Sequence, residues 1–313
     1  MLRTRYRKIV FYAARVILEL IFYDVILGRI GFRRRVTASR VERLRRIAAD
    51  YRALAVEMGG LLIKVGQFLS TRADVLPPVV IDELAQMQDE VPPEAFEAIR
   101  QVVEAELDCP LDTCFVEFDP TSLAAASLGQ VHRARLWLSQ GHHPEGEETQ
   151  RLTPVVVKVQ RPGIEDIVNT DLAAIRTIGK WLKRYPAIRR HADVPALIAE
   201  FTRIVLEEVD YIAEGRNAEI FAENFADRPD VRIPYIVWSH TTQRVLTMED
   251  VYAIKVTDYE AITAAGIDRV EVSQRLIDVY YQQIFEDGFF HADPHPGNLF
   301  VAPIAASSGR RKL

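Results

Sequence analysis

Residues 291–298 form the most restrictive segment of the chain, with the sequence His-Ala-Asp-Pro-His-Pro-Gly-Asn. Asp293 precedes Asn298 by five residues, which is the spacing in the catalytic loop of phosphoryl-transfer enzymes. In such a loop the aspartate accepts a proton from the attacking hydroxyl and the asparagine binds Mg²⁺. The flanking pattern agrees, because a helix is predicted over 271–287 and a short strand over 299–301. We therefore predict Asp293 as a catalytic residue and Asn298 as a metal ligand.

Two other interpretations of this segment remain open. Two prolines and a glycine would equally hold a rigid turn with a capping aspartate. His291, Asp293 and His295 are also suitable metal ligands, but the chain has no second segment of this type to complete a site. The spacing and the flanking elements favour phosphoryl transfer.

A second candidate is Lys158, which lies within the β-branched segment Val155–Val159. An ammonium in the middle of a strand needs anions, and a third-strand lysine that contacts nucleotide phosphates and a helix glutamate meets that need. A lysine that protects a sheet edge from aggregation is the alternative. The pattern predicts a five-stranded antiparallel sheet in an α+β fold. The other predicted strands are Phe115–Phe118, Gln130–Leu136, Val231–Trp238 and Arg244–Met248.

A third candidate is an acidic segment within a long helix predicted over 195–225. On a regular helix one face carries four polar side chains, which are Glu207, Asp210, Glu214 and Asn217. A solvated acidic face is the simplest interpretation, and the alternative is that one glutamate pairs with Lys158. We favour the pairing because the predicted catalytic loop lies downstream.

Helices also dominate the N-terminal third. Ser39 and Glu42 form a capping box that predicts a helix start near Arg40. That helix would end at Gly59-Gly60, and the next one carries an apolar stripe over 61–69 with Lys64 and Gln67 on its flank.

The charge is unevenly distributed. Residues 1–47 hold thirteen Lys and Arg against three acids, a net charge of +10, which leaves −15 for the rest of a chain whose total is −5. The same segment contains an apolar stretch from Ile9 to Ile30 that is interrupted by charges. On a regular helix Lys8, Arg15, Glu19 and Arg29 share one narrow arc while Asp24 lies opposite. The pattern favours an amphipathic helix on an anionic membrane over a spanning helix.

Packing of this segment on the protein's own core is the alternative. Nucleic acid is not expected as a partner, because aromatic residues do not alternate with the basic ones.

Composition excludes other classes of protein. The chain has 49% hydrophobic residues and two cysteines, Cys109 and Cys114. We therefore expect a globular fold with no disulfide framework and no cysteine-based zinc site, in a reducing compartment. No signal peptide is apparent. Neither GxGxxG nor GxxxxGK[ST] occurs, so a Rossmann fingerprint and a P-loop are absent.

Five segments together resemble the UbiB/AarF family of atypical protein-kinase-like proteins over residues 50–301. They are Lys64–Gln67 (KxGQ), Ala124–Ser127 (an Ala-rich loop), Val157–Pro162, Glu208–Tyr211 (ExD) and the loop at 291–298. Each is moderately specific, and their occurrence in this order is highly specific.

The resemblance implies a two-lobed kinase-like fold that binds ATP or ADP with Mg²⁺. An Ala-rich loop of Ala124, Ala125, Ala126 and Ser127 would cover the phosphates. Lys64 and Gln67 would point into the nucleotide site with Lys64 near Glu208 and Asp210, an arrangement that needs a kink because a straight helix separates those two acids. Glu214 would pair with Lys158. Further, the resemblance places Met248 among the nucleotide-binding residues.

The resemblance also implies an organisation and a function. We expect a basic membrane-facing arm (1–47), a helical extension with the KxGQ motif (48–110), a kinase-like N-lobe with inserted helices (111–250) and a partial helical C-lobe (251–313). Family members are membrane-associated and tied to ubiquinone or other isoprenoid lipids. We expect an ATP- and Mg²⁺-dependent atypical kinase or lipid-coupled ATPase. It would lie on a cytoplasmic membrane face, act on a lipid or quinone precursor and form a homodimer. A nucleotide-binding regulatory or scaffold protein without phosphoryl transfer is one alternative. A phosphotransferase for small polar substrates, which would be active without membranes, is another.

The family pattern is incomplete after Asn298. A kinase needs the Asp of a DFG segment as a second Mg²⁺ ligand, and residues 299–313 contain none. We expect a sequence truncated before that segment, which would be inactive by itself, rather than a natural pseudoenzyme.

Overall fold

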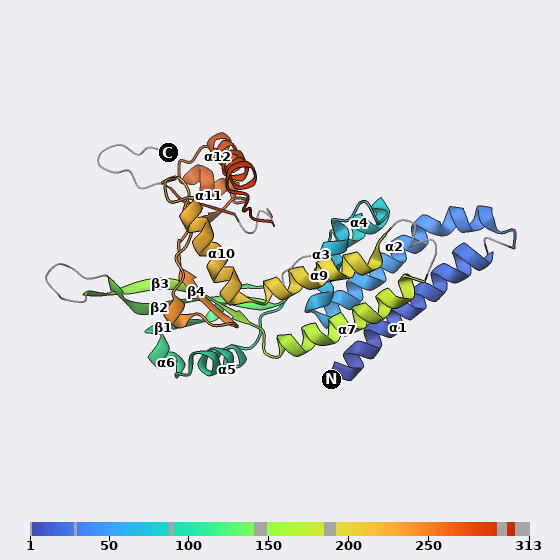
Figure 1. Cartoon of the computed structure of the whole chain (residues 1–313), viewed down its shortest axis with the longest axis horizontal. Helices are drawn as coiled ribbons and strands as arrows, with labels where there is room; N and C mark the ends of the chain where they lie inside the picture. The colour runs from blue at the N-terminus through green and yellow to red at the C-terminus, as the bar shows by residue number, and fades with distance from the viewer. Residues whose placement is uncertain are drawn as a thin grey trace.

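The computed structural model describes residues 2–27, 30–87, 91–140, 149–184, 192–292 and 299–303. Helices gather at one end of the molecule and the main sheet lies at the other, with a third group of helices above the sheet in Figure 1.

A long antiparallel hairpin forms the helical end. Its first arm is α1 (Leu2–Leu20), continued by the π-helix η1 (Ile21–Leu27), and its second arm is α2 (Arg33–Met58). The predicted start near Arg40 is wrong, because α2 begins seven residues earlier and the Ser39 hydroxyl donates to the carbonyl of Val36 inside the helix. Since α2 runs through residue 47, a boundary there falls inside one helix.

Ion pairs along the hairpin set its register. Lys8 pairs with Glu57 and Arg15 with Asp50, so seven residues forward on α1 match seven residues back on α2. Four further residues in each direction bring together Glu19 and Arg46. Lys8, Arg15 and Glu19 of the polar arc predicted on the first helix therefore face α2. Arg29, the fourth residue of that arc, lies outside the described residues.

The π-helix corrects the prediction for Asp24. A regular helix would turn this side chain away from the arc, yet Asp24 accepts from Arg43 at 3.1 Å. The pairs Glu19–Arg46 and Asp24–Arg43 mark the two ends of one stretch of the hairpin. Along this stretch the chain advances five residues on the first arm and three on α2, so the first arm holds two more residues over the same length. Because a π-helix has more residues per turn than an α-helix, η1 accommodates them and keeps Asp24 facing α2.

Helices α3 (Leu61–Ser70), α4 (Pro78–Leu84) and α7 (Ile164–Leu182) pack against the hairpin. Helix α9 (Val194–Glu208) packs on α3 and α7. Ile9, Leu62, Ile63 and Ala174 belong to one buried cluster among these elements. Arg5 of α1 forms a bidentate pair with the fully buried Asp171 of α7 and donates to the carbonyls of Met58 and Gly59. The first helix is therefore fastened to the protein's own core along one face.

Among the described residues the main sheet has four antiparallel strands in the order β1-β2-β3-β4, not the five that were predicted. They are β1 (Glu117–Ala125), β2 (Gly129–Gln140), β3 (Thr149–Gln160) and β4 (Val245–Glu249). The fifth predicted strand, 231–238, contributes one isolated bridge from Ile236 to Met248 and then enters the short 3-10 helix η2 (Trp238–His240).

Helices α5 (Phe96–Leu107) and α6 (Leu111–Cys114) cover one face of the sheet. Their buried side chains pack on Leu136, Val155 and Val157. No disulfide framework was expected from the sequence, and the structure has one local disulfide that was not predicted, between Cys109 and Cys114. The turn at Pro110 and the single turn of α6 bring their Cα atoms to 6.1 Å, within the range for a disulfide.

The long helix predicted over 195–225 is two helices, α9 and α10 (Tyr211–Asn224), separated at Val209–Asp210. Beyond the sheet lie α11 (Tyr259–Ala264), α12 (Arg269–Tyr281) and the π-helix η3 (Gln282–Asp287). The predicted end at Gly288 is confirmed, since this residue adopts φ +62°. The strands β5 (Ile254–Lys255) and β6 (Phe300–Val301) form a separate antiparallel pair.

Candidate nucleotide site

Lys158 and Glu214 form the central ion pair of the site. The Lys158 Nζ atom lies 2.7 Å from both carboxylate oxygens of Glu214. The register places Lys158 between Val131 on β2 and Leu246 on β4, inside the sheet and not at its edge. Glu214 lies in the first turn of α10. The side chains are 29% and 38% exposed, so the pair is accessible from solvent.

The ring of Tyr211 packs against the Lys158 ammonium of this pair. The Lys158 ammonium lies 4.7 Å from the centre of the Tyr211 ring, and the ring itself is 1% exposed. Burial raises the pKa of Tyr211 well above its usual value, and the charges of Glu214 and Glu208 raise it further. Tyr211 is therefore a neutral phenol whose ring face attracts the lysine cation.

Gly129 makes room for Tyr211. A Cβ atom at residue 129 would lie 2.5 Å from the Tyr211 hydroxyl and 2.8 Å from the carbonyl oxygen of Val159. The first residue of β2 thus has to be small for α10 to approach the sheet.

Lys64 and Glu208 form a second ion pair at 2.7 Å. Lys64 lies on α3, and Glu208 is the last residue of α9. The KxGQ helix is thereby tied to the ExD segment, as the resemblance implied. Gln67, one turn later on α3, is partly buried.

The helix break at Val209–Asp210 supplies the kink that the ExD segment needs. Asp210 caps α10 by accepting from the Ala213 amide at 3.1 Å. Gln160, at the end of β3, donates to the carbonyls of Val209 at 2.6 Å and Gln243 at 3.1 Å. Its side chain therefore fixes the break to the sheet, and Glu208 and Asp210 lie on separate helices.

The Ala-rich segment 124–127, predicted as a loop, spans the end of β1 and the start of the turn into β2. Ala124 and Ala125 are paired in the strand, opposite Val131 and Gln130. The amide of Ala126 donates to the carbonyl of Gly129 at 2.8 Å and closes the turn. Ser127 is 1% exposed, and its hydroxyl has no hydrogen-bond partner among the described residues.

Arg161 fastens this turn to the preceding segment. Its guanidinium donates to the Ala126 carbonyl at 2.9 Å, the Pro92 carbonyl at 2.8 Å and the Glu94 carboxylate at 2.5 Å. The roles of Gln160 and Arg161 were not predicted from the sequence, although both residues lie in the Val157–Pro162 motif.

The remaining predicted site residues lie elsewhere. Met248 is on β4, opposite Val156. Asp293 and Asn298 fall outside the described residues, so their catalytic and metal-binding roles stay predictions.

The described part of the site suits a nucleotide better than a metal. Two ammonium groups, on Lys158 and Lys64, each lie beside a carboxylate, which is the charge pattern that binds phosphates and their counter-ions. The unpartnered Ser127 hydroxyl lies in the turn expected over the phosphates. Among the described residues no three His, Cys, Asp or Glu side chains converge on a metal position, so a metal site would depend on Asp293 and Asn298.

Comparisons with known proteins agree with this geometry. Residues 86–307 match the model of the ABC1 atypical kinase-like domain. The chain is 40% identical over 264 residues to an uncharacterized protein of Synechocystis, covering 84% of this chain and 43% of the relative. It is 41% identical over 251 residues to ACTIVITY OF BC1 COMPLEX KINASE 8 of Arabidopsis thaliana, covering 80% of this chain and 31% of the relative.

A third relative is "Probable protein kinase UbiB" of Aeromonas salmonicida, 37% identical over 245 residues, which cover 78% of this chain and 43% of the relative. The chain thus spans less than half the length of these relatives.

A solved structure, the complex of Rv3197 with erythromycin from Mycobacterium tuberculosis, matches with a TM-score of 0.54 and 25% identity. The match covers 87% of this chain and 64% of that one. The five motifs, the Lys158–Glu214 pair and the match over 86–307 agree, and the chain belongs to the ABC1 atypical kinase-like family.

Proposed function

We propose that this chain is the nucleotide-binding part of an ATP- and Mg²⁺-dependent atypical kinase or ATPase. The observation that carries the proposal is the Lys158–Glu214 pair, in which a strand lysine is oriented by a helix glutamate as in active kinases. Since the relatives are longer, the activity belongs to the whole protein.

Each residue would then have a defined task. Glu214 holds the Lys158 ammonium at the sheet, where it can bind phosphate oxygens. The Ala-rich segment 124–127, whose turn is fixed by Arg161, covers the phosphates. Asp293 would orient the attacking hydroxyl and accept its proton, and Asn298 would hold the Mg²⁺, which neutralises charge on the phosphates.

The position of α3 favours a small substrate over a protein. Lys64 fastens this helix to the end of α9, next to the nucleotide site, where it restricts the approach of a folded protein. An open groove of about 740 Å³ begins at Asp210 and follows α9, with Pro195, Ile198 and Leu206 among its lining residues. This apolar surface is compatible with an isoprenoid or quinone-precursor lipid.

The outer face of α1 and η1 supports a peripheral membrane location. Apolar side chains that a soluble helix would normally bury are exposed there, namely Phe11, Leu18, Phe22 and Ile26. Among the helices of the described segments, none combines the length and apolar content needed to cross a bilayer. We therefore propose that this face lies on the membrane surface, with a homodimer as a further expectation for the whole protein.

Nucleotide binding by Lys158→Ala tests the proposal. The substitution removes a charge directed at the phosphates and leaves Glu214 unpaired, so we expect ATP affinity to fall at least about 10-fold in calorimetric titration. Lys180→Ala, at the far end of α7, is the matched control and should bind as the wild type does. Equal affinity of the wild type and Lys158→Ala would contradict the assignment.

Turnover separates the proposed function from the regulatory alternative. A form extended through the complete C-lobe, assayed with lipid vesicles, should release ADP, and Asp293→Asn should abolish this release while ATP still binds. Nucleotide binding without turnover in the extended wild type would support a regulatory or scaffold role.

A further inference from the structure

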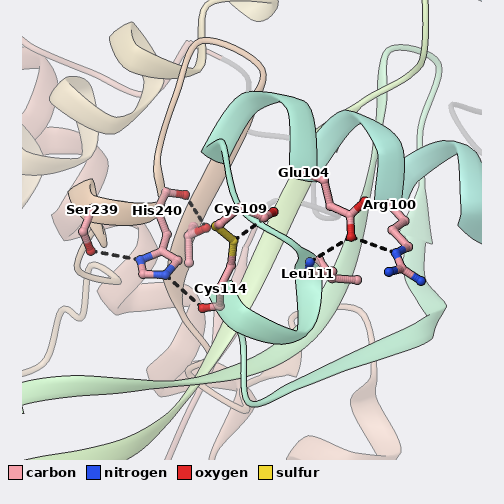
Figure 2. Close-up of a disulfide and its surroundings, with 8 residues drawn as sticks. Arg100, Glu104, Cys109, Leu111, Cys114, Ser239 and His240 are labelled. Carbon is pink, nitrogen blue, oxygen red and sulfur yellow. Dashed lines mark hydrogen bonds and ion pairs between the residues drawn. A yellow bond between two sulfur atoms is a disulfide. The ribbon is translucent and has the colours of Figure 1, made fainter.

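The only two cysteines of the sequence form a disulfide just before the first strand of the main sheet. Cys109 and Cys114 close the connection between α5 and β1, across Pro110 and the single turn of α6. Figure 2 shows the bond below the end of α5, with His240 on its other side. Nothing in the proposed kinase chemistry uses these sulfurs.

We propose that Cys109 and Cys114 are a reversible thiol–disulfide site, reduced by a dithiol and reoxidised by a disulfide such as oxidised glutathione. Its redox state sets the stability of α6 and of the start of β1.

The two sulfurs differ in solvent accessibility, and this decides which of them a reductant attacks. Cys109 is partly exposed, whereas Cys114 is buried in the core cluster with Phe115 and Leu136. A thiolate of the reductant therefore attacks Cys109 Sγ, the S–S bond breaks and the Cys114 thiolate leaves and takes up a proton. The second thiol of the reductant then attacks the reductant's first sulfur, which is bonded to Cys109 in the mixed disulfide, and the Cys109 thiolate is released. Two electrons pass to the cysteine pair, and the reductant leaves as a disulfide.

The buried sulfur has an acceptor in place for the reduced state. Cys114 Sγ lies 3.4 Å from the carbonyl oxygen of Cys109, which is hydrogen-bond distance for a thiol. Reduction therefore does not leave an unsatisfied polar group in the core, and both redox states are compatible with the surrounding packing.

Other contacts hold α6 when the bond is open. His240 Nε2 donates to the Cys114 carbonyl at 3.0 Å, with His240 Nδ1 positioned by the Ser239 hydroxyl at 2.9 Å (Figure 2). At the other end, the Glu104 carboxylate accepts from the Leu111 amide at 2.8 Å and from Arg100 at 2.9 Å. Reduction should loosen this turn without unfolding the sheet.

The turn leads into the strand that carries the Ala-rich segment. The amide of Val116 donates to the Arg135 carbonyl at 2.8 Å and begins the pairing of β1 with β2. An effect on nucleotide affinity would follow from the proposed function, but the redox site does not depend on it.

Thiol counting tests the redox chemistry. Protein prepared without reductant and alkylated after denaturation should show no free thiol, and reduction with dithiothreitol should expose two. Oxidised glutathione should then restore the bond. If the reduced protein still shows two free thiols after treatment with oxidised glutathione, the proposal is overturned.

Native alkylation tests the direction of attack. Cys114→Ser leaves the Cys109 thiol, and Cys109→Ser leaves the Cys114 thiol. Iodoacetamide should modify the first variant at least about 10-fold faster than the second, since reactivity follows access. Equal rates would contradict the assignment of Cys109 as the attacked sulfur.

Hydrogen exchange of the wild type tests whether reduction loosens α6 and the start of β1. Reduction should speed exchange over 111–116 about 10-fold, below the ~40-fold chain-entropy limit for so short a loop. Peptides from α12 serve as the internal control. The double variant Cys109→Ser/Cys114→Ser should exchange like reduced protein in either buffer. Unchanged exchange over 111–116 on reduction would rule out the proposed effect on α6 and β1.

Discussion

His132 is fully buried on β2, with its ring against Phe96 and Phe118. Its Nδ1 donates to the Asp119 carbonyl at 2.8 Å, and its Nε2 accepts from Gln130 Nε2 at 2.7 Å. Gln130 Oε1 in turn accepts from the Glu94 amide at 2.8 Å. This chain of hydrogen bonds requires neutral imidazole, because protonated Nε2 would face the amide hydrogens of Gln130.

Burial lowers the pKa of His132 below its usual value near 6.5. The unfolded chain therefore binds the proton more readily, and this contribution to stability is complete above about pH 6.5 and is lost as pH falls through the lower folded pKa. We expect the urea midpoint of the wild type to fall between pH 7.5 and 5 more steeply than that of His132→Gln. The variant will be less stable at pH 7.5. Parallel pH profiles would contradict this prediction.

Gly129 and Tyr211 give a second prediction at the same scale. Gly129→Ala should destabilise the fold by about 1–3 kcal/mol, because its Cβ would overlap the Tyr211 hydroxyl and the Val159 carbonyl. Tyr211→Phe removes one of these obstacles, so the added cost of Gly129→Ala should be smaller in that background. Denaturation of the four proteins of the cycle measures the coupling, and strictly additive costs would show that the two residues do not compete for space.

At the scale of elements, sequence periodicity predicted the strands better than the helix ends. The segments 130–136, 155–159 and 244–248 lie within or overlap β2, β3 and β4. The segment 155–159 has four valines, which favour a strand. The capping box at Ser39 failed because the pairing of α1 with α2 extends the helix past a local signal. The break at Asp210 was not visible in the periodicity, since it depends on Gln160 from a distant strand.

The π-helix gives a prediction at this scale. Arg43 has a side chain only 6% exposed and stacks on Tyr23 at 4.2 Å, so Asp24→Ala leaves a buried cation without its carboxylate. We expect a loss of about 2 kcal/mol, below the range for fully buried pairs because Asp24 is partly exposed and Arg43 keeps other acceptors. Hydrogen exchange over η1 should accelerate.

Asp50→Ala is the matched control for this prediction. It breaks the exposed pair with Arg15 in the same hairpin and should cost about 0.2–1 kcal/mol. Equal losses in the two variants would show that η1 does not create a distinct buried contact.

At the scale of the whole molecule, the sequence motifs predicted residues that long-range folding brings together. Lys158 and Glu214 are 56 residues apart and meet as the resemblance implied. The role of the first helix was harder to predict, because its cations could face either lipid or protein. The structure pairs Arg5, Lys8 and Arg15 with acids of α7 and α2, which leaves apolar side chains as the main feature of the outer face.

The membrane proposal can therefore be tested through apolar side chains rather than charge alone. Phe22→Ser with Ile26→Ser removes two exposed side chains from η1, and we expect binding to phosphatidylserine-containing vesicles to fall at least about 10-fold in a sedimentation assay. Ile277→Ser on α12 removes a similarly exposed side chain at the other end of the molecule and should leave binding unchanged.

Added salt should weaken binding only modestly, since ion pairs within the protein already neutralise several cations of the first helix. If binding disappears in 0.5 M salt and is unaffected by the η1 substitutions, the membrane contact is instead made by charged side chains. If Ile277→Ser loses vesicle binding as much as the η1 double variant does, the membrane contact lies outside the hairpin.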